Sequence, residues 1–285
     1  MVRKKYTFQQ VFHAVVVAVV VTLGLSVQRA TAEPYTIGIV PQFDSRQLSA
    51  TWTPIIDYLE SETGYEFTFV GSPRIPEFEV AFKNGEFDFA YMNPYHVLRA
   101  AEAQGYQPLV RDGGRKLYGV LVVQKNGPIQ DLSDLNGGQI AFPAPNALGA
   151  SLMMRALLVR EHGLDFQSVF VSTHTSAYMN VALGQADAAG GVQSTLNQLA
   201  PEVRERLRII YETPRVEPHP VVAHPRVPDA VRDAVRDAFL KLGQSEEGLA
   251  LLAPVPMKMP VPATYNDYLP LSVMGLEVFY VKSGL

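Results

Sequence analysis

Residues 87–96 read FDFAYMNPYH, and the pattern of residue types changes along this stretch from that of a β-strand to that of a helix start. Up to Tyr91, aromatic residues alternate with small or polar residues, which is the two-residue period of a β-strand. Asn93 is a favoured helix N-cap, and Pro94 suits the first helical position because its missing N–H would have no partner there. The stretch therefore predicts a strand whose carboxyl end leads directly into a helix.

This junction is also the first candidate for a ligand site. Open α/β sheets bind ligands at the carboxyl ends of their strands, and the free N–H groups of a helix start favour anions. We expect Tyr91, Asn93 and Tyr95 to contact a ligand there. The alternative is that the two tyrosines pack in the core and that Asn93 only caps the helix.

Composition restricts the class of protein. The chain has 285 residues, of which 47% are hydrophobic and 18% charged, which is typical of a folded globular protein. It contains no cysteine, so disulfides, thiolate metal sites and a cysteine nucleophile are excluded. His219 and His224 lie in a proline-rich segment without a convincing third ligand, and we predict no metal site.

The N-terminal residues have the three parts of a secretory signal peptide. A basic start at residues 3–5 precedes an apolar run at residues 14–27, and Ala30-Thr31-Ala32 follows as the cleavage motif. An uncleaved membrane anchor is the alternative, but the apolar run is short for a span. Cleavage after Ala32 predicts a periplasmic protein with 20 basic and 28 acidic residues, a net charge of −8. Such a charge argues against nucleic acid or anionic lipid as a partner.

The remaining chain alternates short apolar strands with amphipathic helices in two similar halves. This order predicts an α/β fold of two lobes, a clamshell in which each lobe has a mostly parallel sheet flanked by helices. After the signal peptide of residues 1–32, we expect the first part of lobe 1 at residues 33–120 and lobe 2 at residues 121–213. Residues 214–285 would return to lobe 1. Their proline-rich start, residues 214–228, is expected to form the crossing and an edge segment.

Further candidate ligand residues follow other predicted strands. A loop that leads into a helix start can hold an anion with its amides, and a histidine after a strand can donate to an oxyanion. These candidates are Gln42, Phe43, Asn146, Gly149, Ser151 and His174.

Several short motifs, in this order and spacing, resemble one known family. They are IGIVP at residues 37–41, GEFDFAY at 85–91, the loop NALGAS at 146–151, His174, and GQADAA at 184–189. The mature chain resembles the phosphate/phosphite/phosphonate-binding (PhnD-like) periplasmic substrate-binding proteins of ABC transporters over essentially its whole length. The resemblance implies a type II-like periplasmic-binding-protein fold that closes around a ligand.

The resemblance implies a phosphorus oxyanion held by a hydroxyl-rich loop, tyrosines and a histidine, with an acidic residue for the amino end of aminoalkyl ligands. This chain departs from that pattern at two positions. The loop at 146–151 keeps only the hydroxyl of Ser151, and Gln193 follows the strand where an acidic residue is often found. We include Gln193 among the ligand-binding candidates, and the choice between phosphate, phosphite and a phosphonate stays open.

The resemblance also implies partners. The protein would be a monomer that passes a small oxyanion to an ABC permease, without a cofactor. A periplasmic sensor that signals to a histidine kinase would use the same fold and is an alternative. An enzyme is less favoured: Ser172, His174 and Asp187 could be arranged as a triad, but no G-x-S-x-G motif is present, and we predict no catalytic residues.

Overall fold

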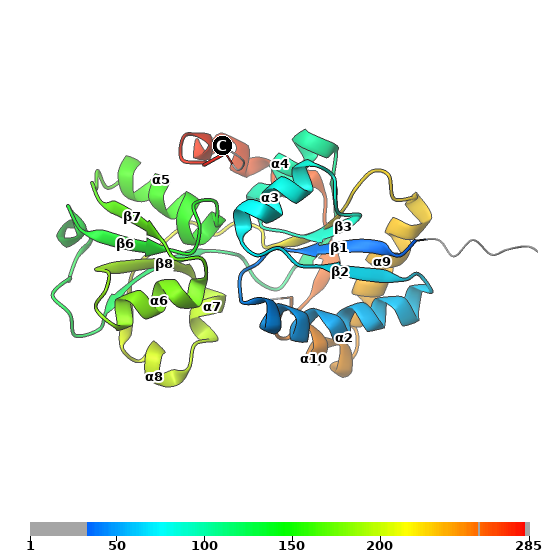
Figure 1. The fold of residues 1–285 in the computed structure, drawn as a ribbon, viewed down its shortest axis with the longest axis horizontal. Helices are drawn as coiled ribbons and strands as arrows, with labels where there is room; N and C mark the ends of the chain where they lie inside the picture. The colour runs from blue at the N-terminus through cyan, green and yellow to red at the C-terminus, as the bar shows by residue number, and fades with distance from the viewer. Residues whose placement is uncertain (1–32, 256, 283–285) are drawn as a thin grey trace, which may run out of the picture. The chain divides into compact units, whose positions relative to one another are not determined.

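The computed structural model describes residues 33–255 and 257–282, which build two mixed β-sheets flanked by helices (Figure 1). We call the half with the six-stranded sheet lobe 1 and the half with the five-stranded sheet lobe 2. The two-lobed α/β prediction is confirmed. The predicted signal peptide, residues 1–32, lies outside the described residues. No helix in the described part combines the length and apolar character needed to cross a membrane.

The first part of lobe 1 alternates strands and helices as the periodicity predicts. Its elements are β1 (Tyr35–Ile39), α2 (Ser45–Thr63), β2 (Phe67–Val70), α3 (Ile75–Lys83), β3 (Phe89–Tyr91), α4 (Pro94–Gln104) and β4 (Gln107–Asp112). The return part adds β10 (Pro220–Ala223), α9 (Asp229–Leu242), α10 (Glu246–Leu252), β11 (Pro260–Pro262) and the 3-10 turns η3 (Tyr265–Asp267), η4 (Leu269–Val273) and η5 (Leu276–Val278).

Lobe 2 is built from one continuous segment. Its elements are β5 (Gly119–Gln124), η1 (Leu132–Leu135), β6 (Gln139–Phe142), η2 (Leu148–Leu152), α5 (Met153–Arg160), β7 (Gln167–Phe170), α6 (His174–Ala182), β8 (Ala188–Val192), α7 (Gln193–Asn197), α8 (Pro201–Arg204) and β9 (Leu207–Glu212). The element η2 is a π-helical turn that continues into α5.

The sheets are mixed, which corrects the expectation that they are mostly parallel. In lobe 1 the order is β11-β4-β10-β3-β1-β2, and β1 is parallel to β2 and β3, whereas β10 is antiparallel to β3 and β4. In lobe 2 the order is β7-β6-β8-β5-β9, and β5 is antiparallel to β8 and β9. Helix crossovers supply the parallel pairs. Strands β5 and β10, each of which directly follows a passage between the lobes, enter their sheet from the opposite end and therefore run antiparallel to their neighbours.

The proline-rich segment contains an inner strand, so its assignment to an edge was wrong. Strand β10 lies between β3 and β4. Pro220 occupies the first position of the strand and needs no ladder N–H there, while its carbonyl accepts a hydrogen bond from the Met92 N–H at 3.2 Å. The prolines flank the strand and leave residues 221–223 free to pair.

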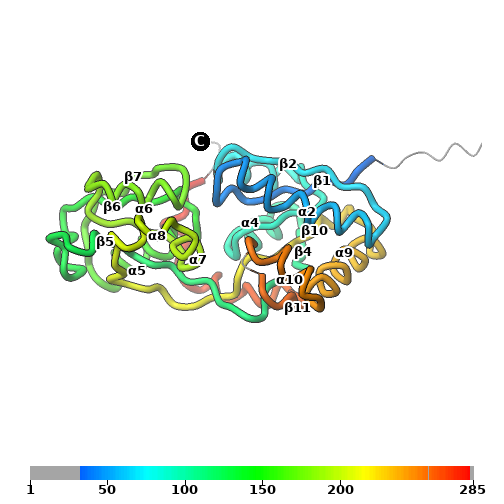
Figure 2. Tube along the Cα trace, turned by 90° about the horizontal axis from the view of Figure 1, so that it is seen from below, coloured from blue at the N-terminus to red at the C-terminus, as the bar shows by residue number. Residues whose placement is uncertain are grey.

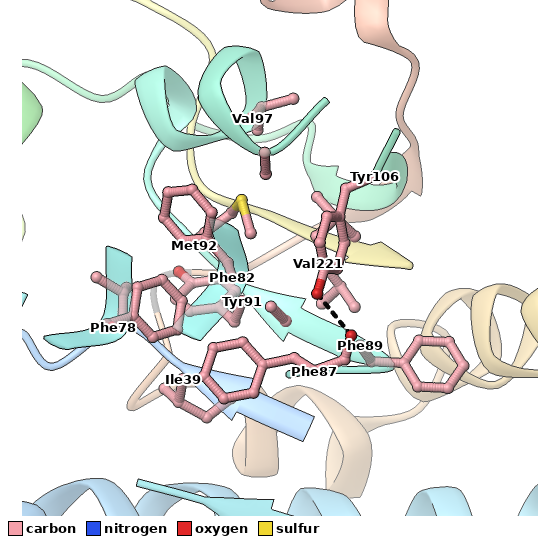
Figure 3. Close-up of a cluster of buried hydrophobic side chains, with 14 of the residues drawn as sticks. Ile39, Phe78, Phe82, Phe87, Phe89, Tyr91, Met92, Val97, Tyr106 and Val221 are labelled. Carbon is pink, nitrogen blue, oxygen red and sulfur yellow. Dashed lines mark hydrogen bonds between the residues drawn. The ribbon is translucent and has the colours of Figure 1, made fainter. Parts of the chain in front are cut away.

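A dense aromatic core holds β3 in lobe 1 (Figure 3). The rings of Phe78 and Phe87 stack with centroids 5.3 Å apart, and the Tyr106 hydroxyl donates to the Phe87 carbonyl at 2.6 Å. Phe87 also covers Gly38, where an added Cβ would lie 2.6 Å from the ring. This packing fixes the position at which β3 ends and α4 begins.

Two segments pass between the lobes, residues 113–118 after β4 and residues 213–219 after β9. They run side by side between the two halves (Figure 2). Leu117 and Val216 form an antiparallel bridge in which each N–H donates to the other's carbonyl at 2.9 Å. We call these two segments the crossing segments. Their positions support the division at residues 33–120, 121–213 and 214–285, which stays a prediction.

In lobe 2, α6 packs on β8 through a glycine. The Tyr178 hydroxyl donates to the Val192 carbonyl at 2.9 Å, and a Cβ at Gly191 would lie 1.9 Å from that hydroxyl oxygen. Tyr178 is fully buried, so it has no space into which to move.

We therefore expect Gly191→Ala to lower the free energy of unfolding by about 3 kcal/mol, because the methyl group overpacks a buried contact. Urea unfolding followed by circular dichroism measures this. Gly71→Ala is the matched control, since its nearest neighbour would lie at an ordinary 3.5 Å, and it should change stability by less than about 1 kcal/mol. Equal stability of the Gly191 variant and the parent would contradict the packing described.

Candidate ligand-binding site

A pocket of about 500 Å³ lies between the two sheets. Residues from both crossing segments form much of its wall. Tyr91 at the end of β3 in lobe 1 and Val192 at the end of β8 in lobe 2 both line the pocket. The carboxyl ends of two strands therefore meet here, which is where open α/β sheets bind ligands. A narrow recess adjoins the pocket and shares Gln42, Val192 and His219 with it.

Four buried polar side chains of this region have unused hydrogen-bonding capacity. Gln42, Tyr91, His174 and His219 are only 8%, 3%, 2% and 7% exposed. Within the described residues, no group hydrogen-bonds the Tyr91 hydroxyl, the Gln42 amide or the His219 imidazole, while His174 Nδ1 lies 3.4 Å from Thr195 Oγ1. Buried polar groups are normally paired. Their convergence on one cavity indicates that a ligand completes their hydrogen bonds.

Backbone amides supply further donors in the recess. Leu148, Gly149 and Ala150 line it and begin the helical segment that continues through α5. The first N–H groups of a helix have no partner within the helix and carry partial positive charge. Gly149 is held by close backbone contact, because a Cβ at Gly119 would lie 2.0 Å from the Gly149 carbonyl oxygen. The recess itself measures only about 10 Å³, so an anionic group would lie where the recess meets the pocket, facing these amides.

The lining of the larger pocket is cationic. It contains Arg115, Lys116, Arg215 and Lys258 and no aspartate or glutamate. The Arg215 guanidinium lies over the Tyr118 ring, 4.4 Å from its centroid, in a cation–π contact. The full chain has a net charge of −4, so this lining opposes the sign of the whole protein at the place where an anion would enter.

The histidines of the site are neutral at physiological pH. Burial lowers the pKa of His174 to about 4. Burial, followed by the neighbouring His96 and His174, lowers the pKa of His219 to about 3. The ring of His219 stacks on Tyr91 with centroids 5.4 Å apart and an interplanar angle of 23°. Each neutral imidazole can donate one N–H and accept at its other nitrogen.

The structure brings six of the ten predicted ligand residues to the pocket or its recess. These are Gln42, Tyr91, Asn93, Gly149, His174 and Gln193. Phe43 lines a separate small cavity beside Trp52. The ligand contacts of these residues stay predictions.

The other three candidates have structural partners. Tyr95 packs on the Tyr280 ring with centroids 5.7 Å apart, and Ser151 Oγ accepts from Arg155 Nε at 3.1 Å. The Asn146 side-chain amide donates to Val281 O at 2.7 Å and accepts from Val281 N at 2.9 Å. None of these side chains lines the pocket.

Asn146 belongs to a buried network that joins the lobes to the C-terminal tail. Its Nδ2 donates to Glu79 Oε2 at 3.0 Å, and the Tyr280 hydroxyl donates to the same oxygen at 3.0 Å. The other oxygen, Glu79 Oε1, lies 3.0 Å from His96 Nε2. Asn93 Nδ2 reaches across to the Asn146 carbonyl at 3.2 Å while Asn93 Oδ1 caps α4 through the His96 N–H.

Sequence reasoning missed the basic lining. Arg115, Lys116 and Arg215 lie in the crossing segments, which have no periodicity to mark them, and Lys258 lies in a loop before β11. His219 was weighed only as a metal ligand. The position of His219 in the chain could have identified it as a site residue. His219 directly precedes β10, which pairs with β3, the strand that carries Tyr91.

The family model described as "ABC transporter, phosphonate, periplasmic substrate-binding protein" matches residues 37–268. The chain belongs to this family. Members are periplasmic substrate-binding components of ABC transporters, which confirms the family resemblance and the class of function. The pocket between the sheets is therefore the candidate ligand site of this member of the phosphonate-binding family.

Relatives agree with this assignment. The chain is 24% identical over 229 residues to the phosphonates-binding periplasmic protein of Escherichia coli K12, a match covering 75% of this chain and 68% of that protein. It is 25% identical over 183 residues to the phosphate-import protein PhnD of Mycolicibacterium smegmatis, covering 56% and 57%. The second match therefore spans just over half the length of that relative. The fold is similar to that of PhnD1 from Prochlorococcus marinus in complex with methylphosphonate, with a TM-score of 0.78, 15% identity and coverage of 87% and 99%.

The lowered histidine pKa values predict acid sensitivity. Between pH 6.5 and 4 the unfolded chain binds more protons at these positions than the folded protein, so the free energy of unfolding falls as pH falls. For His174, with a pKa of about 4, the loss at pH 4 is on the order of 3 kcal/mol. We expect His174→Gln to flatten the pH dependence measured by urea unfolding across this range. The exposed His162→Gln variant is the control, and an unchanged slope in the His174 variant would contradict the assignment.

Asn146→Ala separates a structural role from a ligand-binding role. Loss of its bonds to Glu79 and Val281 should lower the free energy of unfolding by about 2 to 3 kcal/mol, because buried partners lose their hydrogen bonds. Asn84→Ala, which removes one exposed bond to Glu86, should change it by less than about 0.5 kcal/mol. If the Asn146 variant keeps its stability and loses ligand affinity, the residue contacts ligand instead.

Proposed function

We propose that this protein binds a phosphonate or a closely related phosphorus oxyanion in the pocket between its lobes and delivers it to an ABC permease. The observation that carries the proposal is the convergence of unpaired buried donors, free helix amides and four cationic side chains on the pocket and its adjoining recess. Hydrogen bonds to an ionised group are about twice as strong as neutral ones. An oxyanion is therefore the ligand that this set of groups stabilises most.

The end of the pocket that meets the recess suits the phosphoryl group. We propose that the amide of Gly149, the His174 and His219 imidazoles and the Tyr91 hydroxyl donate to its oxygens. The Gln42 amide reaches it from lobe 1, and Gln193, at the start of α7 in lobe 2, lines the wider part of the pocket. Neutral imidazoles are adequate donors, and the nearby anion would favour their protonation. The remaining candidates are proposed to hold these ligand-contacting groups in place without touching the ligand themselves. They are Asn93, Asn146, Phe43, Tyr95 and Ser151.

Lobe closure would complete the site. The two crossing segments are the covalent connections between the described parts of the two sheets, so a hinge movement would be absorbed there. Closure around the ligand excludes water and strengthens each polar contact to the charge. A permease would then recognise the closed form, and the predicted signal peptide would place this exchange in the periplasm.

The site is better suited to binding than to catalysis. The possible triad of Ser172, His174 and Asp187 is not assembled among the described residues. Asp187 Oδ2 accepts from the Gln139 N–H at 2.8 Å, and His174 Nδ1 faces Thr195 Oγ1. No hydrogen bond links the three side chains, which supports a protein that carries its ligand unchanged.

Ligand binding can be tested by thermal shift and calorimetry on the protein starting at Glu33. A phosphonate at about 100 times its dissociation constant adds roughly 2.7 kcal/mol, or about 5 to 10 °C in Tm for a chain of this size. We expect this shift with methylphosphonate, phosphite or phosphate and none with sulfate. Tyr91→Phe and His219→Gln should each weaken binding by about tenfold, as expected for a lost bond to a charged ligand. No shift with any phosphorus oxyanion would overturn the proposal.

A further inference from the structure

We propose that the preferred ligand is a phosphonate whose substituent carries a second anionic group, a carboxylate being the simplest case. This inference rests on the proposed function, since it identifies the chemical class of the same ligand. It follows from the size of the pocket and from the charges around the part of it that a phosphonate head would not occupy.

The pocket is much larger than a simple phosphonate. Methylphosphonate has five non-hydrogen atoms and displaces about three waters, on the order of 90 Å³. The pocket measures about 500 Å³, so a phosphonate head at its junction with the recess would occupy only a small part of it. Cavities of this size accommodate larger organic ligands. The substituent on phosphorus would therefore extend into the larger space.

That larger space is lined by cations. Arg115, Lys116 and Arg215 come from the crossing segments and Lys258 from the loop before β11. At the start of α7 the same lining contains the neutral side chain of Gln193. Its Nε2 donates to Asn197 Oδ1 at 2.8 Å, so these two amides form a neutral part of the wall. An ammonium group would meet no carboxylate in this lining.

None of the acidic partners of these cations lines the pocket. Asp112 accepts from Arg115 Nε at 3.2 Å, Glu212 from Arg215 Nη2 at 3.2 Å, and Glu217 pairs with Lys116. Asp112 is 1% exposed and also accepts from two backbone N–H groups, so it cannot turn toward a ligand.

Lys258 is different from the other three cations. In the described part of the chain, no carboxylate lies within the 4.0 Å of an ion pair to its ammonium group. A second anionic group on the ligand would supply the missing partner. Because Lys258 and Arg215 are exposed, this contribution should be modest and should decrease with salt.

Titration calorimetry at low salt with three ligands tests the inference. Phosphonoacetate, methylphosphonate and 2-aminoethylphosphonate share the phosphonate head and differ in the charge of the substituent. We expect phosphonoacetate to bind about tenfold more tightly than methylphosphonate, and 2-aminoethylphosphonate to bind more weakly than either. Raising the salt concentration should reduce the first difference, because the added attraction is between exposed charges.

Variants identify the residues responsible. Lys258→Gln should reduce the affinity for phosphonoacetate about threefold to fivefold and the affinity for methylphosphonate by a clearly smaller factor. The double variant Lys258→Gln and Arg215→Gln should reduce the affinity for phosphonoacetate about tenfold. Lys125→Gln, an exposed lysine at the far end of β5, is the matched control and should change neither affinity. Gln193→Glu should raise the affinity for 2-aminoethylphosphonate and lower the affinity for phosphonoacetate.

The two possible failures are distinguishable. If methylphosphonate binds as tightly as phosphonoacetate and Lys258→Gln has no selective effect, the inference is overturned and the proposed function stands. Tighter binding of 2-aminoethylphosphonate than of methylphosphonate would overturn the inference in the same way. If none of the three ligands binds, the proposed function itself fails.

Discussion

The paired hydrogen bonds between Leu117 and Val216 are the constraint on which the site depends. The chain passes between its two sheets twice, and this bridge holds the two passages in register. Because the passages lie together, basic residues separated by about a hundred positions in the sequence line one cavity.

The buried donors of this site are neutral, whereas its charged side chains are partly or fully exposed. The deep donors are neutral: burial keeps both histidines uncharged, and the tyrosine and amide groups carry no net charge. The formal positive charge lies toward solvent, where arginine and lysine keep their hydration and cost little to place. A negatively charged protein can in this way attract an anion at the rim and hold it inside by directed hydrogen bonds.

Local sequence signals predicted most of the fold. The junction at residues 87–96 forms the expected strand and helix, and Asn93 caps the helix through its Oδ1, because strand period and cap chemistry are properties of neighbouring residues. Strand β10 was assigned to an edge because proline is disfavoured inside a sheet, and this rule was applied to the whole of residues 214–228. Within β10 the only proline is Pro220, at the first position. For the site, strand ends indicated Tyr91 and His174. The cationic lining could not be predicted, because it depends on long-range pairing between segments that have no periodic pattern.

The discontinuous build of lobe 1 has a consequence for the order of folding. Lobe 2 is one unbroken segment, whereas the sheet of lobe 1 needs β10 and β11 from the last third of the chain. Glu79 acquires the hydroxyl of Tyr280 only when nearly the entire polypeptide has been synthesised. Contacts so far apart in sequence form slowly, because a long loop must close before they contribute. The nascent protein would therefore carry a completed second lobe beside a first lobe in which Glu79 has not yet received the Tyr280 hydroxyl, and a chaperone would encounter the unfinished edge of β3.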